Sequence, residues 1–248
     1  CDNDAFEPIT AEMVLEAILI LKRGTAVGID YWSPADWRLL DQLGAQALAD
    51  ILNMCEHAKA WPAHVLYNII VLMGKPTGGT RPIALMPMLY RVWTKVRKPY
   101  IIAWEAKYAG PWDAAMRGSS ALRASLLSKM REELSTLQGE QVLSILYDME
   151  KFYDNIDIGV LIKEARRLEY PPTLLGMGLQ MHMALRGIRC YSIFPGETIP
   201  TNGIIAGCSQ STTFAKILLH SIMQGAYEHH LGEIITFPLG VPATAGGV

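Results

Sequence analysis

The predicted organisation of this chain centres on Leu143-Ser144-Ile145-Leu146-Tyr147-Asp148. The apolar, β-forming residues of this stretch predict a buried strand that ends on an aspartate, and Asp157 is placed to cap the amphipathic helix that follows. A carboxylate at the end of a buried strand is a good ligand for Mg²⁺, which prefers oxygen donors and keeps positions open for phosphate oxygens. Asp148 is therefore the candidate metal ligand. An aspartate in this place can equally be a turn former or a helix cap.

A basic β-hairpin is predicted upstream, over residues 68–85. Residues 68–75 and 81–85 have strand character, and Pro76-Thr77-Gly78-Gly79-Thr80 between them is a turn sequence. The hairpin places Lys75 and Arg81 on opposite strands near its tip. Two cations in this arrangement can hold one polyphosphate, the arginine through its fork and the lysine as a point charge. A solvated basic loop is the simpler alternative.

The charge of the chain is distributed unevenly. Its 248 residues carry a formal net charge of −2, and half of them are hydrophobic, which indicates a folded globular chain. From His57 through Trp104 there is no Asp or Glu, whereas this stretch holds seven of the 22 Lys and Arg residues. Such a basic block suits contact with phosphate groups, although a basic face that meets an acidic lobe would have the same composition.

Cysteine spacing and hydropathy narrow the class of protein. The four cysteines, Cys1, Cys55, Cys190 and Cys208, are far apart and form no Cys-x-x-Cys pair, so neither a zinc site nor a disulfide framework is indicated. No apolar run reaches the roughly 18 residues that a membrane span needs. The sequence predicts an intracellular protein without a membrane segment, with a nuclear location left open.

A glycine-rich stretch, Gly203-Ile204-Ile205-Ala206-Gly207-Cys208-Ser209-Gln210-Ser211, leads into a helix expected to end near residue 231. Gly203 and Gly207 would let the backbone approach a base pair closely, and the N-terminus of the helix favours phosphate. A glycine-rich entry into a helix, without any ligand, is the alternative.

The remaining elements follow from hydrophobic periodicity and capping residues. Helices are predicted over residues 10–23, 34–43, 46–59, 88–98, 119–137, 158–168 and 173–185. Thr10 is the expected cap of the first helix, and Ser119 or Ser120 of the fifth, whose expected inward side chains are Leu122, Leu126, Leu127, Met130 and Leu134. A second hairpin is predicted over 188–201 with its turn at Pro195-Gly196, and residues 105–118 are expected to form a long connection.

Three of these motifs resemble those of reverse transcriptases and occur in the order of that family: the basic hairpin, the Asp148 motif and the glycine-rich loop. Asp148-x-x-Lys151-x-Tyr153-Asp154 is similar to the first catalytic motif of the group II intron and non-LTR retrotransposon enzymes, and the hairpin resembles their fingers hairpin. Gly203, Gly207 and Ser211 match fixed positions of the family pattern Gly-x-Pro-Gln-Gly-x-x-x-Ser-Pro. The pattern is broken by Ile205, Ala206 and Thr212, which replace its Pro, Gln and Pro. Upstream, Gly28-Ile29-Asp30 resembles the segment that precedes the fingers in non-LTR-type enzymes.

The resemblance implies an α+β, right-hand polymerase fold, rich in helices. Residues 1–118 would form a fingers-like region with the basic hairpin (68–85), and residues 119–236 would form a partial palm with an antiparallel sheet and the late fingers helices. Residues 237–248 would be a disordered or artificial end.

The resemblance also implies RNA-directed DNA polymerase activity of a retroelement, which is Mg²⁺-dependent nucleotidyl transfer with an RNA template, a DNA primer and deoxynucleoside triphosphates. Asp148 would be the catalytic residue and, with the Met149 carbonyl, would bind the metal ions. Tyr153 would exclude the 2′-hydroxyl of ribonucleotides. The expected nucleotide contacts are Lys75, Arg81, Met149, Tyr153, Gly203 and Gly207. The oligomeric state is left open.

A two-metal site needs carboxylates from a second strand, which the family supplies in an aromatic-x-Asp-Asp hairpin. No Asp follows Asp157 in this sequence. The chain is therefore expected to be a fragment that is truncated before this motif and inactive alone. Two rival hypotheses remain: a non-catalytic, RNA-binding derivative of a reverse transcriptase, and an unrelated Mg²⁺-dependent phosphotransferase.

Overall fold

A computed structural model describes residues 6–74, 76, 78–116, 119–141, 149–190, 193–228, 234–236 and 242–244. The chain divides into two units, each built from two separate stretches. Unit 1 contains Cys1–Ile101 and Lys151–Ala215, and unit 2 contains Ile102–Glu150 and Lys216–Val248. The domain boundaries proposed from the sequence, at residues 118 and 236, stay predictions.

Two of the unit 1 helices, α1 Ala11–Ile20 and α7 Ile158–Arg167, begin at the capping residues that the sequence predicts. The bounds of the others are α2 Pro34–Trp37, α3 Gln42–Ala58, α4 Met88–Val96 and α8 Pro172–His182, with short 3₁₀ turns at η1 Ala63–Val65 and η2 Phe152–Asn155. Two longer helices, α5 Lys98–Tyr108 and α9 Ser211–Glu228, begin in unit 1 and continue into unit 2. The side chains of Thr10 and Asp157 accept the expected backbone N–H groups of Met13 and Val160.

The predicted helix over residues 34–43 is wrong in length. It stops at Trp37, and α3 starts at Gln42 rather than at residue 46. The reason is a second capping signal, because the Asp41 carboxylate accepts a hydrogen bond from the Gly44 N–H at 2.8 Å. An Asp N-cap starts a new helix with its own axis.

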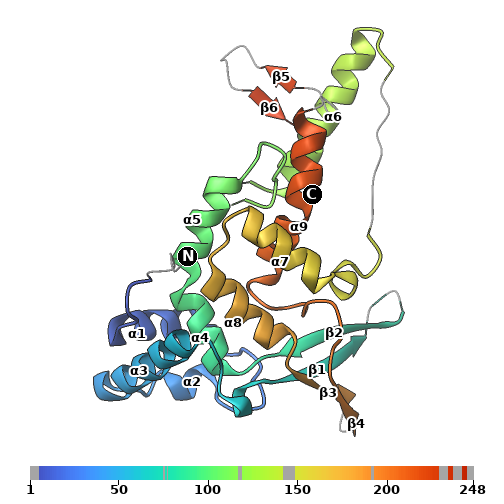
Figure 1. Ribbon diagram of the computed structural model, residues 1–248. Helices are drawn as coiled ribbons and strands as arrows, with labels where there is room; N and C mark the ends of the chain where they lie inside the picture. The colour runs from blue at the N-terminus through green and yellow to red at the C-terminus, as the bar shows by residue number, and fades with distance from the viewer. Residues whose placement is uncertain are drawn as a thin grey trace. The chain divides into compact units, whose positions relative to one another are not determined.

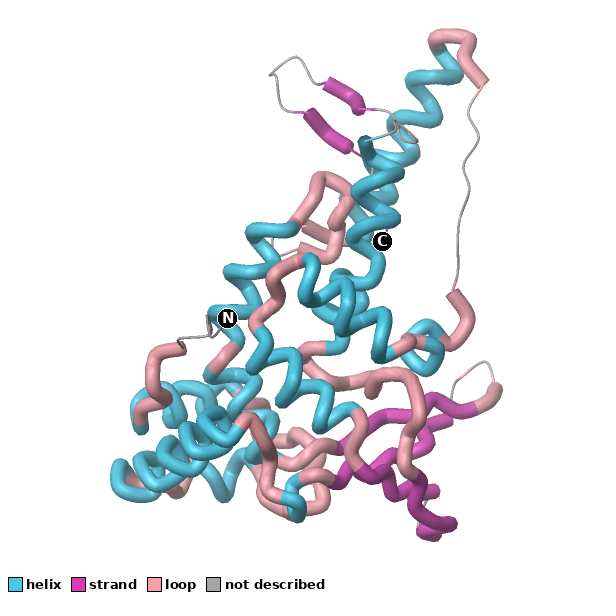
Figure 2. Tube along the Cα trace, in the orientation of Figure 1, coloured by secondary structure: helices cyan, strands magenta, loops and turns pink. Residues whose placement is uncertain are grey.

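The four strands β1 to β4 form one mixed sheet, on one side of the unit 1 helices (Figures 1 and 2). The predicted hairpin is confirmed, since β1 Tyr67–Gly74 pairs antiparallel with β2 Thr80–Leu85. The second hairpin, β3 Leu185–Cys190 with β4 Ile193–Thr198, joins the first through parallel pairing of β1 and β3. The predicted fold class is thus confirmed as helix-rich with both α and β structure, but the described sheet is mixed rather than antiparallel. The expected palm strand at 143–148 lies outside the described residues.

The turn of the second hairpin was predicted in the wrong place. Pro195 and Gly196 belong to strand β4, where Gly196 is paired with Ile188; β3 ends at Cys190 and β4 begins at Ile193. A proline is tolerated here because β4 is the edge of the sheet, so one side of the strand needs no ladder hydrogen bonds.

A buried ion pair holds α3 to the end of α4. Arg97 is fully buried, and its Nε and Nη2 atoms donate to the two carboxylate oxygens of Glu56 at 2.6 and 2.5 Å. Its Nη1 donates to the Glu7 carbonyl at 2.9 Å, and its guanidinium lies 4.9 Å from the centre of the Phe6 ring. One of the seven cations in the basic block is therefore part of the interior.

Unit 2 contains the rest of α5 and α9, with helix α6 Ala121–Leu137 and the paired strands β5 Ile234–Thr236 and β6 Pro242–Thr244. On α9, Lys216 forms ion pairs with Asp113 at 3.0 Å and with Glu105 at 3.8 Å. In the described residues, no helix combines the length and the hydropathy required to cross a membrane.

The helices of unit 2 differ from two further predictions. Ser120 caps α6 as expected, and residues 105–108, predicted as connection, belong to α5. The side chains expected to face inward are largely exposed, with 80% for Leu122, 58% for Leu126 and 44% for Leu134. Periodicity shows which face of a helix is apolar, but not whether another element covers that face.

Removing one partner of the buried pair tests its contribution to stability. Glu56→Ala should lower the free energy of unfolding by about 3–5 kcal/mol, because it leaves the fully buried Arg97 charge uncompensated. Glu164→Ala, which breaks the more exposed pair with Arg167, is the control and should change stability by about 1 kcal/mol or less. Urea denaturation measures both, and equal effects would contradict the structural role of Arg97.

Candidate functional site

Two of the predicted motifs lie against each other in unit 1. The Gly203 N–H donates to the Ile156 carbonyl at 2.9 Å, and the Ile204 N–H donates to the Tyr153 carbonyl at 2.8 Å. We call these two hydrogen bonds the backbone seam. It joins segments that are about fifty residues apart in the sequence, and so places the Tyr153 segment beside the glycine-rich loop.

Gly203 makes this seam possible for two reasons. Its φ of +79° is strained for any residue with a side chain. A Cβ at this position would also lie 2.6 Å from the Asp154 carbonyl oxygen, closer than real contacts allow. The close approach that Gly203 makes is therefore to protein backbone. Its predicted approach to a nucleotide stays a prediction.

The other end of the loop lies beside the hairpin. The Ala84 N–H of strand β2 faces the Ala206 carbonyl at 3.5 Å. Gly207 follows with a φ of +101°, and a Cβ there would meet only ordinary contacts with Ile83 and Ala84. Gly207 is thus required by its backbone conformation rather than by space. The loop connects the Tyr153 segment on one side with the hairpin on the other.

A pocket of about 430 Å³ opens where the loop, strand β2 and helix α4 meet. We call it the basic pocket, because among the described residues its charged side chains are Lys22, Arg91 and Lys95, with no Asp or Glu. Gly207 and Ser209 contribute to its wall. Burial lowers the pKa of Lys95, and the nearby charge of Lys98 lowers it further. The burial means that the Lys95 charge is only partly solvated, so its attraction to an anion in the pocket is less screened by water. The repulsion from Lys98 would also be relieved by a bound anion.

The Gly28-Ile29-Asp30 segment does not line the pocket, but it contacts Met86, which does, and the start of α4. The Asp30 carboxylate accepts the N–H of Met88, the first residue of α4, at 2.5 Å. Gly28 lies so close to the Met86 carbonyl that a Cβ would be 2.5 Å from its oxygen. Arg91 donates to the Ala26 carbonyl at 2.6 Å, which fixes the loop over the pocket. Burial raises the pKa of Asp30, against its hydrogen bonds and the Arg91 charge.

His182 was missed by the sequence analysis. It is fully buried at the end of α8, and its Nδ1 accepts a hydrogen bond from the Ile205 N–H at 2.8 Å. The ring proton of the neutral imidazole is therefore assigned to Nε2. Burial lowers the pKa of His182 to about 3, with a smaller effect from the Arg186 charge. The only signal in the sequence is a single histidine at the end of a mainly apolar helix.

The other predicted site residues differ in exposure and in the unit to which they belong. Arg81 is exposed on β2 opposite Met73, and Tyr153 is half-buried in η2. Met149 is exposed and belongs to unit 2. Asp148 and Lys75 lie outside the described residues. Within the described ranges, no group of three or more His, Cys, Asp or Glu side chains could hold a metal ion.

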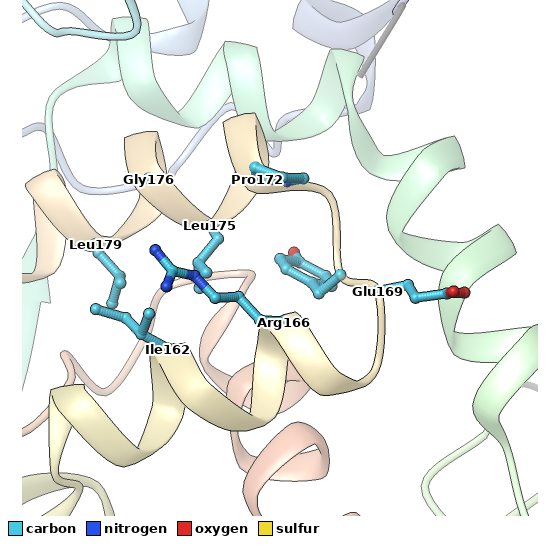
Figure 3. Close-up of a pocket in the computed structure, with 8 residues that line it drawn as sticks. Ile162, Arg166, Glu169, Pro172, Leu175, Gly176 and Leu179 are labelled. Carbon is cyan, nitrogen blue, oxygen red and sulfur yellow. The ribbon is translucent and has the colours of Figure 1, made fainter. Parts of the chain in front are cut away.

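A second pocket, of about 620 Å³, lies between α7 and α8. Its lining is mainly apolar, and Figure 3 shows Arg166 extending from α7 toward Leu175 and Leu179 of α8 while Glu169 points away. None of the predicted site residues lines it. The basic pocket is therefore the better candidate site, although it is smaller.

Comparison with known proteins adds no relative. Neither the search of protein-family models nor the search of curated proteins returned a match to this chain. What the site can do chemically is therefore inferred from its residues and their geometry.

The low pKa of His182 predicts a pH dependence of stability. An ordinary histidine has a pKa near 6.5, so below that pH the unfolded chain binds a proton that the folded chain refuses. The free energy of unfolding should fall by up to about 1.4 kcal/mol per pH unit as the pH drops from about 6.5 toward 3.

The measurement is urea denaturation at pH 7 and pH 5 for the wild type and for His182→Asn. The wild type should lose about 2 kcal/mol more than the variant over this interval, since the variant lacks the titrating group. An equal loss in both proteins would mean that His182 is not held neutral in the folded state.

Proposed function

We propose that this chain is part of an RNA-directed DNA polymerase of the reverse transcriptase type, covering the fingers and the first part of the palm. One observation carries the proposal: the glycine-rich loop contacts both the Tyr153 segment and strand β2 of the hairpin, beside a pocket whose described lining contains three cations and no acid. The motifs that resemble those of the family are thus neighbours in space, as a shared substrate would require. The parallel pairing of β1 with β3 also ties the hairpin to the strands that precede the loop.

The proposed roles follow the order of the motifs. Asp148 would be the catalytic carboxylate, and Lys75 and Arg81 would hold the triphosphate of the incoming nucleotide. Tyr153 would exclude the 2′-hydroxyl, while Gly207 would let the loop approach the template–nucleotide pair. The basic pocket would take a phosphate of the nucleic acid, because Lys22 and Lys95 face a concave surface without acidic neighbours in its lining.

Mg²⁺ fits the donors that the motif offers. The Asp148 carboxylate and the Met149 carbonyl are oxygen ligands, the type that Mg²⁺ prefers. When bound, the ions would neutralise charge on the transferred phosphoryl group. What the chain itself contributes is the orientation of substrate: cations for the phosphates, and the Tyr153 segment, held by the backbone seam, for the sugar.

A non-catalytic RNA-binding derivative is the second candidate. Ala206 replaces the glutamine of the family pattern, and its methyl group cannot make a polar contact with a base pair. This candidate keeps the basic pocket and its affinity for nucleic acid, but not the chemical step.

Primer extension separates the two candidates. The complete product of the gene that encodes these residues is incubated with an RNA template, a DNA primer, deoxynucleotides and Mg²⁺. Asp148→Asn should reduce extension by about a hundredfold or more, while RNA affinity stays within about twofold. RNA binding by the wild type without any extension would favour the non-catalytic derivative. Absence of RNA binding would overturn both candidates.

The basic pocket makes a separate prediction about affinity. Replacing Lys22 and Lys95 together by Gln should weaken binding of single-stranded RNA about tenfold at 0.1 M salt. The slope of log K against log salt should become shallower by about 0.7 for each phosphate that the variant no longer neutralises. Fluorescence anisotropy measures both quantities.

Lys163→Gln is the matched control, because Lys163 is exposed on α7 and does not line the pocket. It should leave both the affinity and the salt slope close to those of the wild type. An equal loss in the control would show that the affinity comes from overall charge rather than from this pocket.

A further inference from the structure

His182 lies behind the proposed site and contacts its loop from the interior. The imidazole Nδ1 accepts the Ile205 N–H, and the Ile205 carbonyl in turn accepts the Ser211 hydroxyl at 2.5 Å. Ile205 is itself buried. Both backbone polar groups of this residue are thus satisfied by side chains, one from the end of α8 and one from the start of α9.

The backbone seam begins directly beside Ile205. Gly203 and Ile204 donate their N–H groups to Ile156 and Tyr153, and Ile205 donates the next N–H to His182. Three consecutive N–H groups of the loop are therefore held. Two of them donate to the Tyr153 segment and the third donates to His182. His182 therefore fixes Ile205, the residue next to the two that pair with the Tyr153 segment.

His182 is also connected, through Arg186, to the Tyr153 segment of the backbone seam. Arg186 on β3 donates from Nη2 to the His182 carbonyl at 3.0 Å. Burial lowers the pKa of Arg186, and attraction to the Asp154 carboxylate opposes this shift. Asp154 follows Tyr153, and its own carbonyl oxygen faces Gly203. His182 is thus linked to both segments that the seam joins.

A residue that only filled space would not need an acceptor at Nδ1. The Ile205 N–H is buried, and a buried N–H without a partner is strongly unfavourable. In the described residues, the Nε2 atom of His182 has no hydrogen-bond partner. The imidazole therefore acts through a single ring atom, which makes its role testable by moving one acceptor.

We propose that His182 is a positioning residue that holds Ile205, keeps Gly203 and Ile204 paired with Ile156 and Tyr153, and thereby sets the position of the Tyr153 ring. The first part concerns the backbone alone. The second part, that this position governs the choice between deoxyribonucleotides and ribonucleotides, rests on the proposed function.

Two amide variants move the acceptor without changing the polarity of the site. In His182→Asn the side-chain oxygen can take the place of Nδ1, whereas in His182→Gln it lies one methylene further out, near the place of Nε2. His64→Asn, at an exposed histidine of the same unit, is the control. Amide hydrogen exchange of the native chain is measured at Gly203, Ile204 and Ile205.

Exchange at these three amides should be at least about tenfold faster in His182→Gln than in the wild type, and within about threefold of the wild type in His182→Asn. Amides of strand β1 should not change in either variant. Equal exchange in the Asn and Gln variants would overturn the proposal, since the acceptor at Nδ1 would then have no role.

The second readout is the ratio of deoxyribonucleotide to ribonucleotide incorporation by the complete gene product. His182→Gln should lower this ratio about tenfold through KM, and His182→Asn should restore it. Faster exchange with an unchanged ratio would overturn the link to Tyr153. If the wild type extends no primer, the proposed function fails, and the exchange data alone decide whether His182 positions the two segments.

Discussion

The candidate site depends on the backbone seam between Gly203 and Ile204 on one side and Tyr153 and Ile156 on the other. The two hydrogen bonds are short, and the glycine that permits them has a positive φ and no space for a Cβ. Because backbone hydrogen bonds fix both distance and direction, the seam sets the position of the Tyr153 segment relative to the loop more strictly than side-chain packing would. The contacts of His182, Arg186 and Ser211 with these segments extend the same arrangement into the interior.

The basic pocket depends on a different constraint, the start of helix α4. Asp30 caps the first N–H of α4, and Gly28 lies against the Met86 carbonyl just before it. The hydrogen bond from Arg91 to the Ala26 carbonyl then holds the loop around residue 26 at the wall of the pocket. The carboxylate of Asp30 thus has a structural role close to the site, and it is not among the described residues that line the pocket.

The basic block of the sequence is divided among three tasks. Arg97 is an interior residue that pairs with Glu56, Arg91 anchors a loop and lines the pocket, and Arg81 is exposed on the hairpin. A count of charges cannot separate these tasks, because guanidinium groups serve buried pairs and anion sites equally well. The net charge of −2 therefore understates how positive the surface of the pocket is.

The sequence by itself determined the local structure and the order of the motifs. The caps at Thr10, Ser120 and Asp157 and the hairpin over residues 68–85 follow from interactions between residues close in the chain. Two local predictions were wrong. The start of α3 was missed because Asp41 is a second capping residue, and the turn of the second hairpin was misplaced because Pro195 is tolerated in an edge strand.

Only the tertiary structure decided which segments meet. Two contacts, the parallel pairing of β1 with β3 and the hydrogen bond between His182 and Ile205, join residues that are far apart in the sequence. The exposure of the apolar face of α6 likewise depends on which elements pack nearby, and not on the sequence of the helix. A sequence cannot show whether a buried histidine accepts a hydrogen bond or only packs against its neighbours. The difference lies in the Ile205 N–H, which only the folded chain places beside the imidazole. The site is therefore predictable from the sequence in its motifs, but not in the interior contacts that hold those motifs in place.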